Sequence, residues 1–259
     1  MQITTRGATL HVRTYGEDGE PVLLLHGALS DDLQNWRLIH EPLARKHRVI
    51  GLDLRGHGQS DNPSGIFTLD ALRDDILDVL DLLQLDRVHV LGASLGGYVG
   101  LALRFYHPKR VGSLATAGSK IGWDRETAEN RAAFFHPENI LKAHPLWAPH
   151  LAKAHGGHYG PAHWKTLVKN VRELLQTLPD EPAVQYEALK RETLPLFYAV
   201  GDRDDLVPLE EVVRIRHARP DAAILVAPKA GHLFREYNQE LFVAGYMEFL
   251  RRNPFGALP

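Results

Sequence analysis

Residues 88–98 place the strongest constraint on how this chain can fold. They begin with an apolar, β-branched run typical of a strand, continue through Gly92-Ala93-Ser94-Leu95-Gly96, and end in a segment typical of a helix. A serine in a G-x-S-x-G turn between a strand and a helix exposes its hydroxyl at the edge of a sheet, and small flanking residues permit the strained backbone of that turn. Ser94 is therefore a candidate nucleophile, which would need a histidine base and a carboxylate elsewhere in the chain.

Short apolar runs alternate with amphipathic segments over the first half of the chain. This pattern predicts strands and helices that build a mostly parallel, doubly wound α/β sheet. Apolar residues recur at helical spacing after Thr68, a plausible N-cap, and again near residues 241–250, so both segments are predicted as helices packed on the sheet. The expected strands cover residues 10–15, 22–25, 49–52, 88–91, 111–115, 194–200 and 224–227.

The strand pattern stops near Gly118 and returns at residue 194. Residues 120–190 instead carry helical stretches, several prolines and three of the four tryptophans. We expect a core made of residues 1–119 and 191–259, with residues 120–190 as a helical insertion over it. Trp147 and Trp164 are predicted mainly as the insertion's own core, with the lining of a substrate pocket as the alternative.

Composition excludes several classes of function. A formal net charge of −2 and the lack of a long basic run argue against nucleic acid as a partner. The absence of cysteine removes thiol catalysis and thiolate metal sites. No apolar run is long enough for a membrane span, and the N-terminal residues lack the apolar core of a secretory signal. A small-molecule substrate and a cytoplasmic location are therefore expected.

Two later segments offer the partners that Ser94 would need. Asp202, Asp204 and Asp205 follow the strand predicted at 194–200, and His232 follows the strand predicted at 224–227. The order serine, acid, histidine is that of α/β-hydrolases, and the carboxyl ends of parallel strands meet at one edge of a sheet.

The chain resembles the α/β-hydrolase superfamily over nearly its whole length. Beyond the serine motif, the resemblance rests on four matches: His26-Gly27-Ala28 after a strand, Trp36 beyond it, Asp53-Leu54-Arg55-Gly56-His57-Gly58-Gln59-Ser60 as D-x-R-G-x-G-x-S, and residues 201–208 as G-x-x-D-x-x-x-P. It implies an α/β-hydrolase fold with a helical cap between the sixth and seventh strands. It also selects Asp204 as the acid, although spacing alone leaves Asp202 and Asp205 open.

The resemblance implies a serine hydrolase, esterase-like, without metal or cofactor. Ser94 would attack the carbonyl carbon of a small ester, thioester or lactone, His232 would carry the proton, and Asp204 would orient the imidazole. In the family the oxyanion is held by backbone N–H groups, which here would be those of Ala28 and Leu95.

Other activities share the same residues. Carbon–carbon bond hydrolases, lyases of quinone biosynthesis and cofactor-free perhydrolases remain alternatives, as does a ligand-binding receptor with little turnover. Ser94 argues against haloalkane dehalogenases and epoxide hydrolases, which use an aspartate nucleophile. Leu95 departs from the tryptophan that proline iminopeptidases usually carry after the serine.

Several polar residues have a structural interpretation. We expect the segment from Asp53 to Ser60 to be a tight turn braced by charges, and His26 to shape the oxyanion loop. Residues 120–190 hold six histidines, which we interpret as a polar, solvated surface rather than a metal site, because Gly156-Gly157 argues against a helix that would pair His155 with His158.

Overall fold

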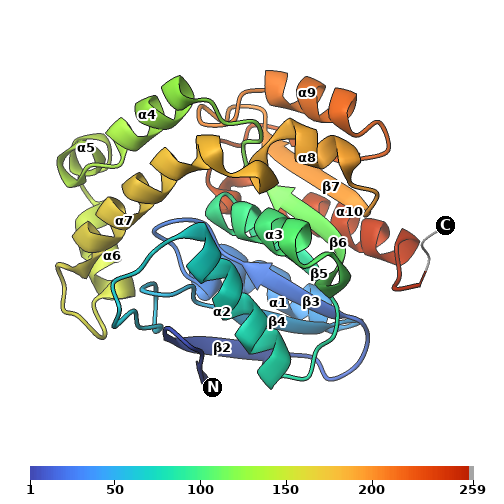
Figure 1. Cartoon of the computed structure of the whole chain (residues 1–259), viewed down its shortest axis with the longest axis horizontal. Helices are drawn as coiled ribbons and strands as arrows, with labels where there is room; N and C mark the ends of the chain where they lie inside the picture. Colours follow the sequence, from blue (N-terminus) through green and yellow to red (C-terminus); the bar gives the residue numbers. More distant parts are fainter. Residues whose placement is uncertain (257–259) are drawn as a thin grey trace.

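Eight strands form one sheet across the molecule (Figure 1). The computed structural model describes residues 1–256. The strand order is β1-β2-β4-β3-β5-β6-β7-β8; the two pairs that involve β2 are antiparallel and the other five are parallel. The bounds are β1 (Gln2–Thr4), β2 (Thr9–Tyr15), β3 (Pro21–Leu25), β4 (Arg48–Leu52), β5 (Val88–Ala93), β6 (Val111–Ala117), β7 (Leu196–Gly201) and β8 (Ala223–Ala227). The predicted, mostly parallel sheet is confirmed.

One strand was not predicted, and the bounds of the others differ from the prediction by one or two residues. Strand β1 was not predicted, because it has only three residues and its alternation of exposed and buried side chains is too short a pattern to be recognised. Strand β7 begins at Leu196 rather than at residue 194. Pro195 precedes it and has no backbone N–H for a strand ladder, although its carbonyl still accepts from Leu114 N–H at 3.0 Å.

Helices cover both faces of the sheet. Helices α2 (Leu69–Leu82) and α3 (Leu95–Tyr106) lie on one face, and α1 (Asp32–Ala44) and α10 (Gln239–Arg252) lie on the other (Figure 1). The central strands β3, β5 and β6 are therefore almost wholly buried, which explains their mainly apolar sequences. Helix α2 begins where predicted, because the Thr68 side chain accepts the Ala71 N–H at 3.2 Å.

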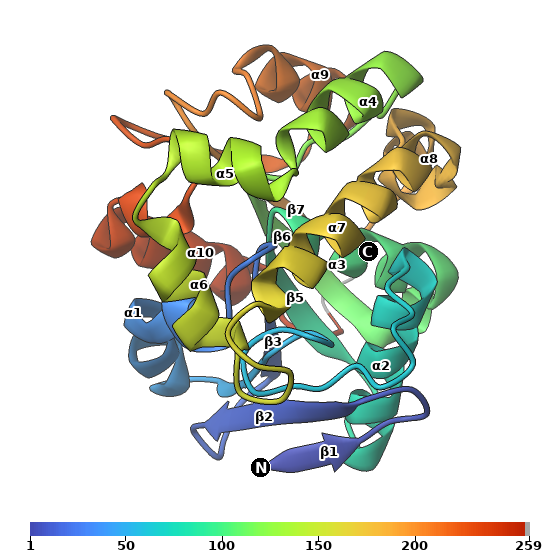
Figure 2. The same cartoon turned by 90° about the vertical axis from the view of Figure 1, so that its left-hand side faces the viewer.

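Five helices separate β6 from β7 along the chain. They are α4 (Arg125–Phe134), α5 (Pro137–Ala143), α6 (Trp147–His155), α7 (His163–Thr177) and α8 (Tyr186–Arg191), and we call residues 120–190 the inserted segment. Helices α4 to α7 extend across the end of the sheet at which the parallel strands finish (Figures 1 and 2). Helix α9 (Glu210–Ala218) and short 3-10 turns at Pro108–Arg110, Leu178–Asp180, Pro182–Val184 and Phe234–Glu236 complete the described elements.

The inserted segment has a hydrophobic cluster of its own. Its buried members are Ile140, Leu151, Trp164, Leu167 and Val168, and Leu29 from the β3–α1 loop joins them. The rest of the core forms two clusters, one on each face of the sheet, and the cluster on the side of α2 and α3 also includes residues of the inserted segment such as Val171 and Leu174.

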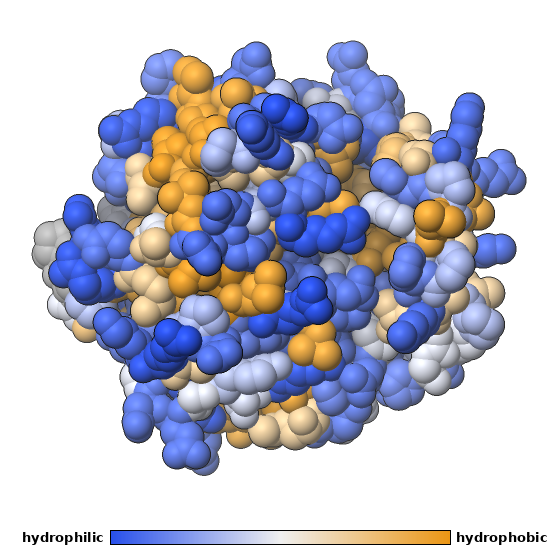
Figure 3. Space-filling model, turned by 180° about the vertical axis from the view of Figure 1, so that it is seen from behind, coloured by the Kyte–Doolittle hydropathy of each residue, from blue (hydrophilic) through white to orange (hydrophobic). Residues whose placement is uncertain are grey.

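The face of the molecule opposite to that in Figure 1 is mainly hydrophilic, with hydrophobic residues gathered in patches between the hydrophilic ones (Figure 3). Exposed large apolar residues of this chain include Leu38 in α1, Val226 in β8 and Leu241 in α10. Among the described residues, none of the helices combines the length and the apolar composition that crossing a bilayer requires.

Candidate active site

Ser94 occupies a strained turn between β5 and α3. Its backbone has φ +46° and ψ −109°, a combination that side-chain-bearing residues rarely adopt. Glycine is required on both sides, because a Cβ on Gly92 would collide with the backbone at Gly96 and a Cβ on Gly96 would collide with the Leu25 carbonyl. The close approach of strand and helix thus exposes the Ser94 hydroxyl at the carboxyl end of β5.

Ser94, His232 and Asp204 lie in a hydrogen-bonded row. His232 Nε2 lies 3.2 Å from Ser94 Oγ, and His232 Nδ1 lies 3.0 Å from Asp204 Oδ2 and 3.1 Å from Asp204 Oδ1. The Asp204 side chain is fully buried, whereas that of His232 keeps 17% of its surface exposed. A buried carboxylate behind a partly exposed imidazole can hold the ring so that Nε2 faces the serine.

Asp204 is distinguished from its two neighbouring aspartates by its contacts. Its Oδ1 accepts the N–H groups of Leu206 and Val207, both at 2.9 Å. Asp202 is exposed and accepts Ala230 N–H at 3.3 Å, and Asp205 is exposed. Neither has a hydrogen bond to His232 among the described residues.

Ala28 and Leu95 line the same cavity as Ser94 and His232. Leu95 is the first residue of α3, and Ala28 lies in the loop between β3 and α1. Among residues 1–256, neither backbone N–H donates to a protein acceptor. Both donors are therefore available to an oxygen atom bound next to Ser94.

A cavity of about 1410 Å³ lies between the sheet and the inserted segment. Its lining is largely apolar and includes Trp123, Phe135, Trp147 and Leu174 from the inserted segment and Tyr98 from α3. Trp164 is 3% exposed and does not line the cavity, so one of the two tryptophans is core and the other is lining. Burial raises the pKa of Tyr98, so its hydroxyl stays protonated at neutral pH.

The segment from Asp53 to Ser60 is braced by buried contacts. Asp53 accepts from the backbone N–H groups of Asp32 and Gln59, both at 3.0 Å, and from Arg13 at 3.1 Å. Ser60 Oγ donates to the Asp53 carbonyl at 2.5 Å.

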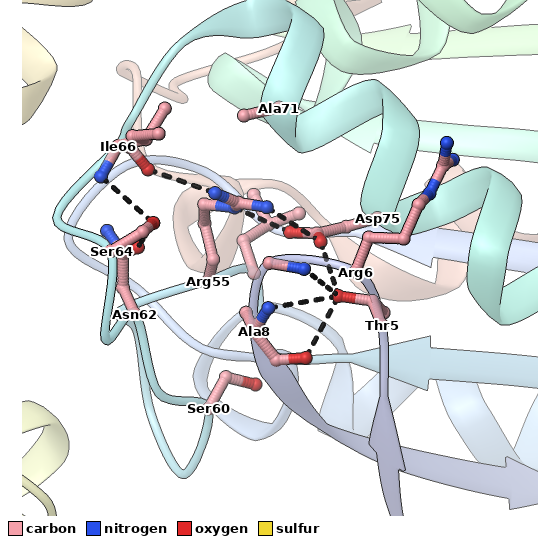
Figure 4. Close-up of polar contacts among 12 residues, drawn as sticks. Thr5, Arg6, Ala8, Arg55, Ser60, Asn62, Ser64, Ile66, Ala71 and Asp75 are labelled. Atoms are coloured by element: carbon pink, nitrogen blue, oxygen red, sulfur yellow. Dashed lines mark hydrogen bonds and ion pairs between the residues drawn. The ribbon is translucent and has the colours of Figure 1, made fainter.

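Arg55 is the anchor of this segment. It donates to both oxygens of Asp75 in α2, at 2.6 and 2.8 Å, and to the Ile66 carbonyl at 3.1 Å (Figure 4). Thr5 reaches the same carboxylate at 2.7 Å. These contacts agree with the structural interpretation of the segment.

His26 and His57 bind the backbone next to the site. His26 Nε2 accepts Leu54 N–H at 2.9 Å, and His57 Nε2 accepts Leu29 N–H at 3.3 Å. Burial lowers the pKa of His57 well below its usual value, and the neighbouring His26 and His155 lower it further. A neutral His57 keeps Nε2 as an acceptor.

The expectation of a solvated histidine surface on residues 120–190 is wrong for His155. This residue is 2% exposed, and its Nδ1 accepts Gly58 N–H at 2.9 Å. His163 and His158 also reach the same loop, at the carbonyls of Gly56 and Gln59. Helix α6 does end at His155, next to the Gly156-Gly157 pair, but tertiary packing places that end against the loop of residues 53–60. Among residues 1–256, no three histidine, aspartate or glutamate side chains are grouped as metal ligands.

Sequence reasoning missed the support behind Ser94. Ser119 Oγ donates to the Ser94 carbonyl at 3.0 Å, and Tyr198 donates to the Ser119 carbonyl at 3.0 Å. These residues follow β6 and lie within β7, so no local pattern links them to the serine motif.

A family model and two known proteins are similar to this chain in sequence. The family model described as alpha/beta hydrolase fold matches residues 20–238. The dihydrolipoyllysine-residue acetyltransferase component of the acetoin cleaving system of Pseudomonas putida is 30% identical over 92% of this chain and 65% of its own length. The 3-oxoadipate enol-lactonase 1 of Acinetobacter baylyi is 37% identical over 57% of each chain.

A solved structure extends the similarity to three dimensions. The thermophilic esterase from Thermogutta terrifontis matches with a TM-score of 0.72 and 26% identity, covering 97% of this chain and 98% of its own. The chain spans between about half and two thirds of the length of the two sequence relatives above. With its sheet order, its serine turn and the family model that matches most of its length, the chain belongs to the α/β-hydrolase fold family.

Proposed function

We propose that this protein is a serine hydrolase that cleaves an ester, thioester or lactone of a small molecule through an acyl-enzyme on Ser94. One observation carries the proposal: the Ser94 hydroxyl, the His232 imidazole and the Asp204 carboxylate are joined by contacts of 3.2 and 3.0 Å beside a large cavity. A nucleophile hydrogen-bonded to a base, which a third group orients, is the geometry that covalent acyl transfer requires.

Acylation begins when Ser94 Oγ attacks the carbonyl carbon. His232 Nε2 accepts the hydroxyl proton as the new C–O bond forms, and Asp204 stabilises the resulting imidazolium. The tetrahedral intermediate then collapses, the bond to the leaving oxygen or sulfur breaks, and His232 returns the proton to that leaving group.

Deacylation repeats this sequence with water. His232 takes a proton from the water as its oxygen attacks the acyl carbon, and it returns the proton to Ser94 Oγ when the ester bond to the enzyme breaks. The acid product leaves and the serine is regenerated. No cofactor enters this scheme.

The N–H groups of Ala28 and Leu95 serve as the oxyanion hole in this proposal. Both residues line the cavity beside Ser94. Each donor of this kind contributes about 3 to 4 kcal/mol to the transition state. Because both groups belong to the main chain, changing the two side chains tests them poorly.

The inserted segment acts in this proposal as the cap of the active site. It supplies much of the apolar lining of a cavity of about 1410 Å³, above the common range of about 300 to 1,000 Å³ for small-molecule sites. This volume favours a substrate with a sizeable apolar part. The enol-lactonase and the esterase among the similar proteins support an ester-type bond as the one cleaved.

The test is hydrolysis of p-nitrophenyl esters of increasing acyl length, with labelling by a fluorophosphonate probe. Wild type is expected to hydrolyse the esters over many turnovers and to be labelled by the probe. Ser94→Ala is expected to lose both turnover and labelling. Ser64 is exposed, and the control variant Ser64→Ala is expected to keep both. Labelling without ester turnover would favour a carbon–carbon hydrolase, a lyase or a receptor. If Ser94→Ala kept both turnover and labelling, the assignment of Ser94 as the nucleophile would be overturned.

A further inference from the structure

Leu29 has an unusual backbone next to the proposed oxyanion hole. It follows Ala28 directly and has φ +57°, in the left-handed region that residues with a large side chain seldom occupy. Such a conformation persists only where surrounding contacts hold it. One peptide unit joins Leu29 to Ala28, so a rotation of the Leu29 backbone can turn the residue that carries the Ala28 N–H.

The Leu29 side chain packs into the inserted segment rather than into the sheet. It is 8% exposed and joins the cluster formed by Ile140 of α5, Leu151 of α6, and Trp164, Leu167 and Val168 of α7. Within residues 1–256, every other buried member of this cluster belongs to the inserted segment. Leu29 thus ties the loop after β3 to the helices that cover the cavity.

Two histidines hold the same loop from the backbone side. Leu29 N–H donates to His57 Nε2 at 3.3 Å, and His57 Nδ1 lies 3.1 Å from the Arg55 carbonyl, so the proton of a neutral ring belongs on Nδ1. The His57 ring meets His155 of α6 at a ring-centre distance of 5.5 Å and an angle of 86°. His155 in turn accepts Gly58 N–H. The inserted segment therefore contacts Leu29 in two ways. It packs against the Leu29 side chain, and through His155 it contacts His57, which accepts the Leu29 N–H.

We propose that Leu29 is a positioning residue through which the seating of the inserted segment on the sheet sets the direction of the Ala28 N–H in the oxyanion hole. The proposal rests on the function proposed above. When the inserted segment is packed on the sheet, it holds the strained Leu29 backbone and keeps the Ala28 N–H aligned. When the inserted segment moves away from the sheet, Leu29 loses the packing that holds it, and the loop after β3 relaxes.

The first test compares Leu29→Ala with Leu29→Met and with Leu77→Ala. Leu77 in α2 has the same 8% exposure as Leu29 but lies outside the cavity lining, so its truncation is a matched control for lost apolar packing. Leu29→Ala is expected to lower kcat for a p-nitrophenyl ester by about 10- to 100-fold, since a misplacement of about 1 Å costs up to about 100-fold, with KM changed less than about threefold. Leu29→Met fills a similar volume and is expected to restore most of kcat. Leu77→Ala is expected to keep kcat within about twofold of wild type.

A variant at a distance separates positioning from substrate contact. Leu29 itself lines the cavity, whereas Leu167 is fully buried beside it and does not. Leu167→Ala is therefore expected to lower kcat in the same direction as Leu29→Ala. An increase in KM alone in Leu29→Ala, with kcat unchanged in both variants, would overturn the proposal and make Leu29 a substrate contact.

Amide hydrogen exchange gives a measurement that does not depend on turnover. Exchange at residues 27–31 is expected to be faster in Leu29→Ala and Leu167→Ala than in wild type and in Leu77→Ala. Unchanged exchange there in both variants would overturn the coupling, whatever the activity. Absence of ester turnover in wild type would instead count against the proposed function, while the exchange data still decide the coupling.

Discussion

The Asp204 carboxylate meets Nδ1 of His232 with both of its oxygens, at 3.0 and 3.1 Å. Its Oδ1 also accepts two backbone N–H groups, so the position of the carboxylate does not depend on its contact with the imidazole alone. This arrangement gives the first prediction.

Asp204→Asn is expected to lower kcat for ester hydrolysis by about 10³- to 10⁴-fold, because an amide does not stabilise the imidazolium and disturbs its tautomer. Asp202→Asn is the matched control and is expected to cost less than about 10-fold, since Asp202 is exposed and bonded to the Ala230 backbone. Steady-state kinetics on one p-nitrophenyl ester decide between them. The reverse ranking would move the acid role to Asp202.

Gly96→Ala is expected to destabilise the fold by about 3 kcal/mol and to abolish activity. Alanine normally favours a helix by about 1 kcal/mol over glycine, but here the new Cβ would collide with the Leu25 carbonyl and lie 2.8 Å from the His26 carbonyl oxygen. Backbone on a buried strand has little room to yield, so the collision outweighs the propensity. Urea unfolding measures the effect, and Gly157→Ala, with no heavy atom within 4 Å of its Cβ, is expected to change the free energy of unfolding by less than about 0.5 kcal/mol. Equal losses in the two variants would contradict the packing argument.

Asp75→Asn is expected to cost about 3 kcal/mol of the free energy of unfolding. Arg55 and Asp75 are 5% and 3% exposed in their side chains, so loss of the carboxylate leaves a buried guanidinium without its counter-charge. Asp78 lies three residues further along α2 and pairs with Arg6, whose side chain is 72% exposed. Asp78→Asn is therefore expected to cost less than about 1 kcal/mol by the same measurement. A cost for Asp78→Asn as large as that for Asp75→Asn would show that burial does not decide the value of these pairs.

Stability is expected to fall as the pH is lowered from about 6.5 to 4. The pKa of His155 is lowered from its usual 6.5 to about 4, mainly by burial. The neighbouring His26 and His163 add to this decrease, and the Leu29 backbone and Asp31 partly oppose it. Over this range the unfolded chain binds a proton at His155 that the folded chain does not, so protons favour unfolding by up to about 3 kcal/mol.

His155→Asn isolates this contribution. Asparagine keeps an acceptor near the position of Nδ1 for the Gly58 N–H but does not titrate. Urea unfolding between pH 7 and 4 is expected to show a shallower pH dependence in His155→Asn than in wild type. Identical slopes in the two proteins would contradict the role given to His155.

Local sequence signals predicted much of the fold and named the residues that meet at the site. The apolar runs of β3, β5 and β6 are long enough to recognise because both of their faces are buried, and the Thr68 cap marks the start of α2 through one local hydrogen bond. Strand β1 gave too short a pattern, and spacing alone did not separate Asp204 from Asp202 and Asp205.

The sequence by itself determined the α/β architecture, Ser94, His232 and a group of three candidate aspartates, because periodicity and turn glycines act over a few neighbouring residues. The family resemblance then selected Asp204 among the three. Only the tertiary structure decided that Asp204 faces His232, that Ser119 and Tyr198 support the Ser94 backbone, and that His155 is buried against the loop of residues 53–60. Likewise, only the fold brought Leu29 into the cluster of the inserted segment. These contacts join residues far apart in the chain, and their existence depends on how the inserted segment packs rather than on any local preference of the residues that make them.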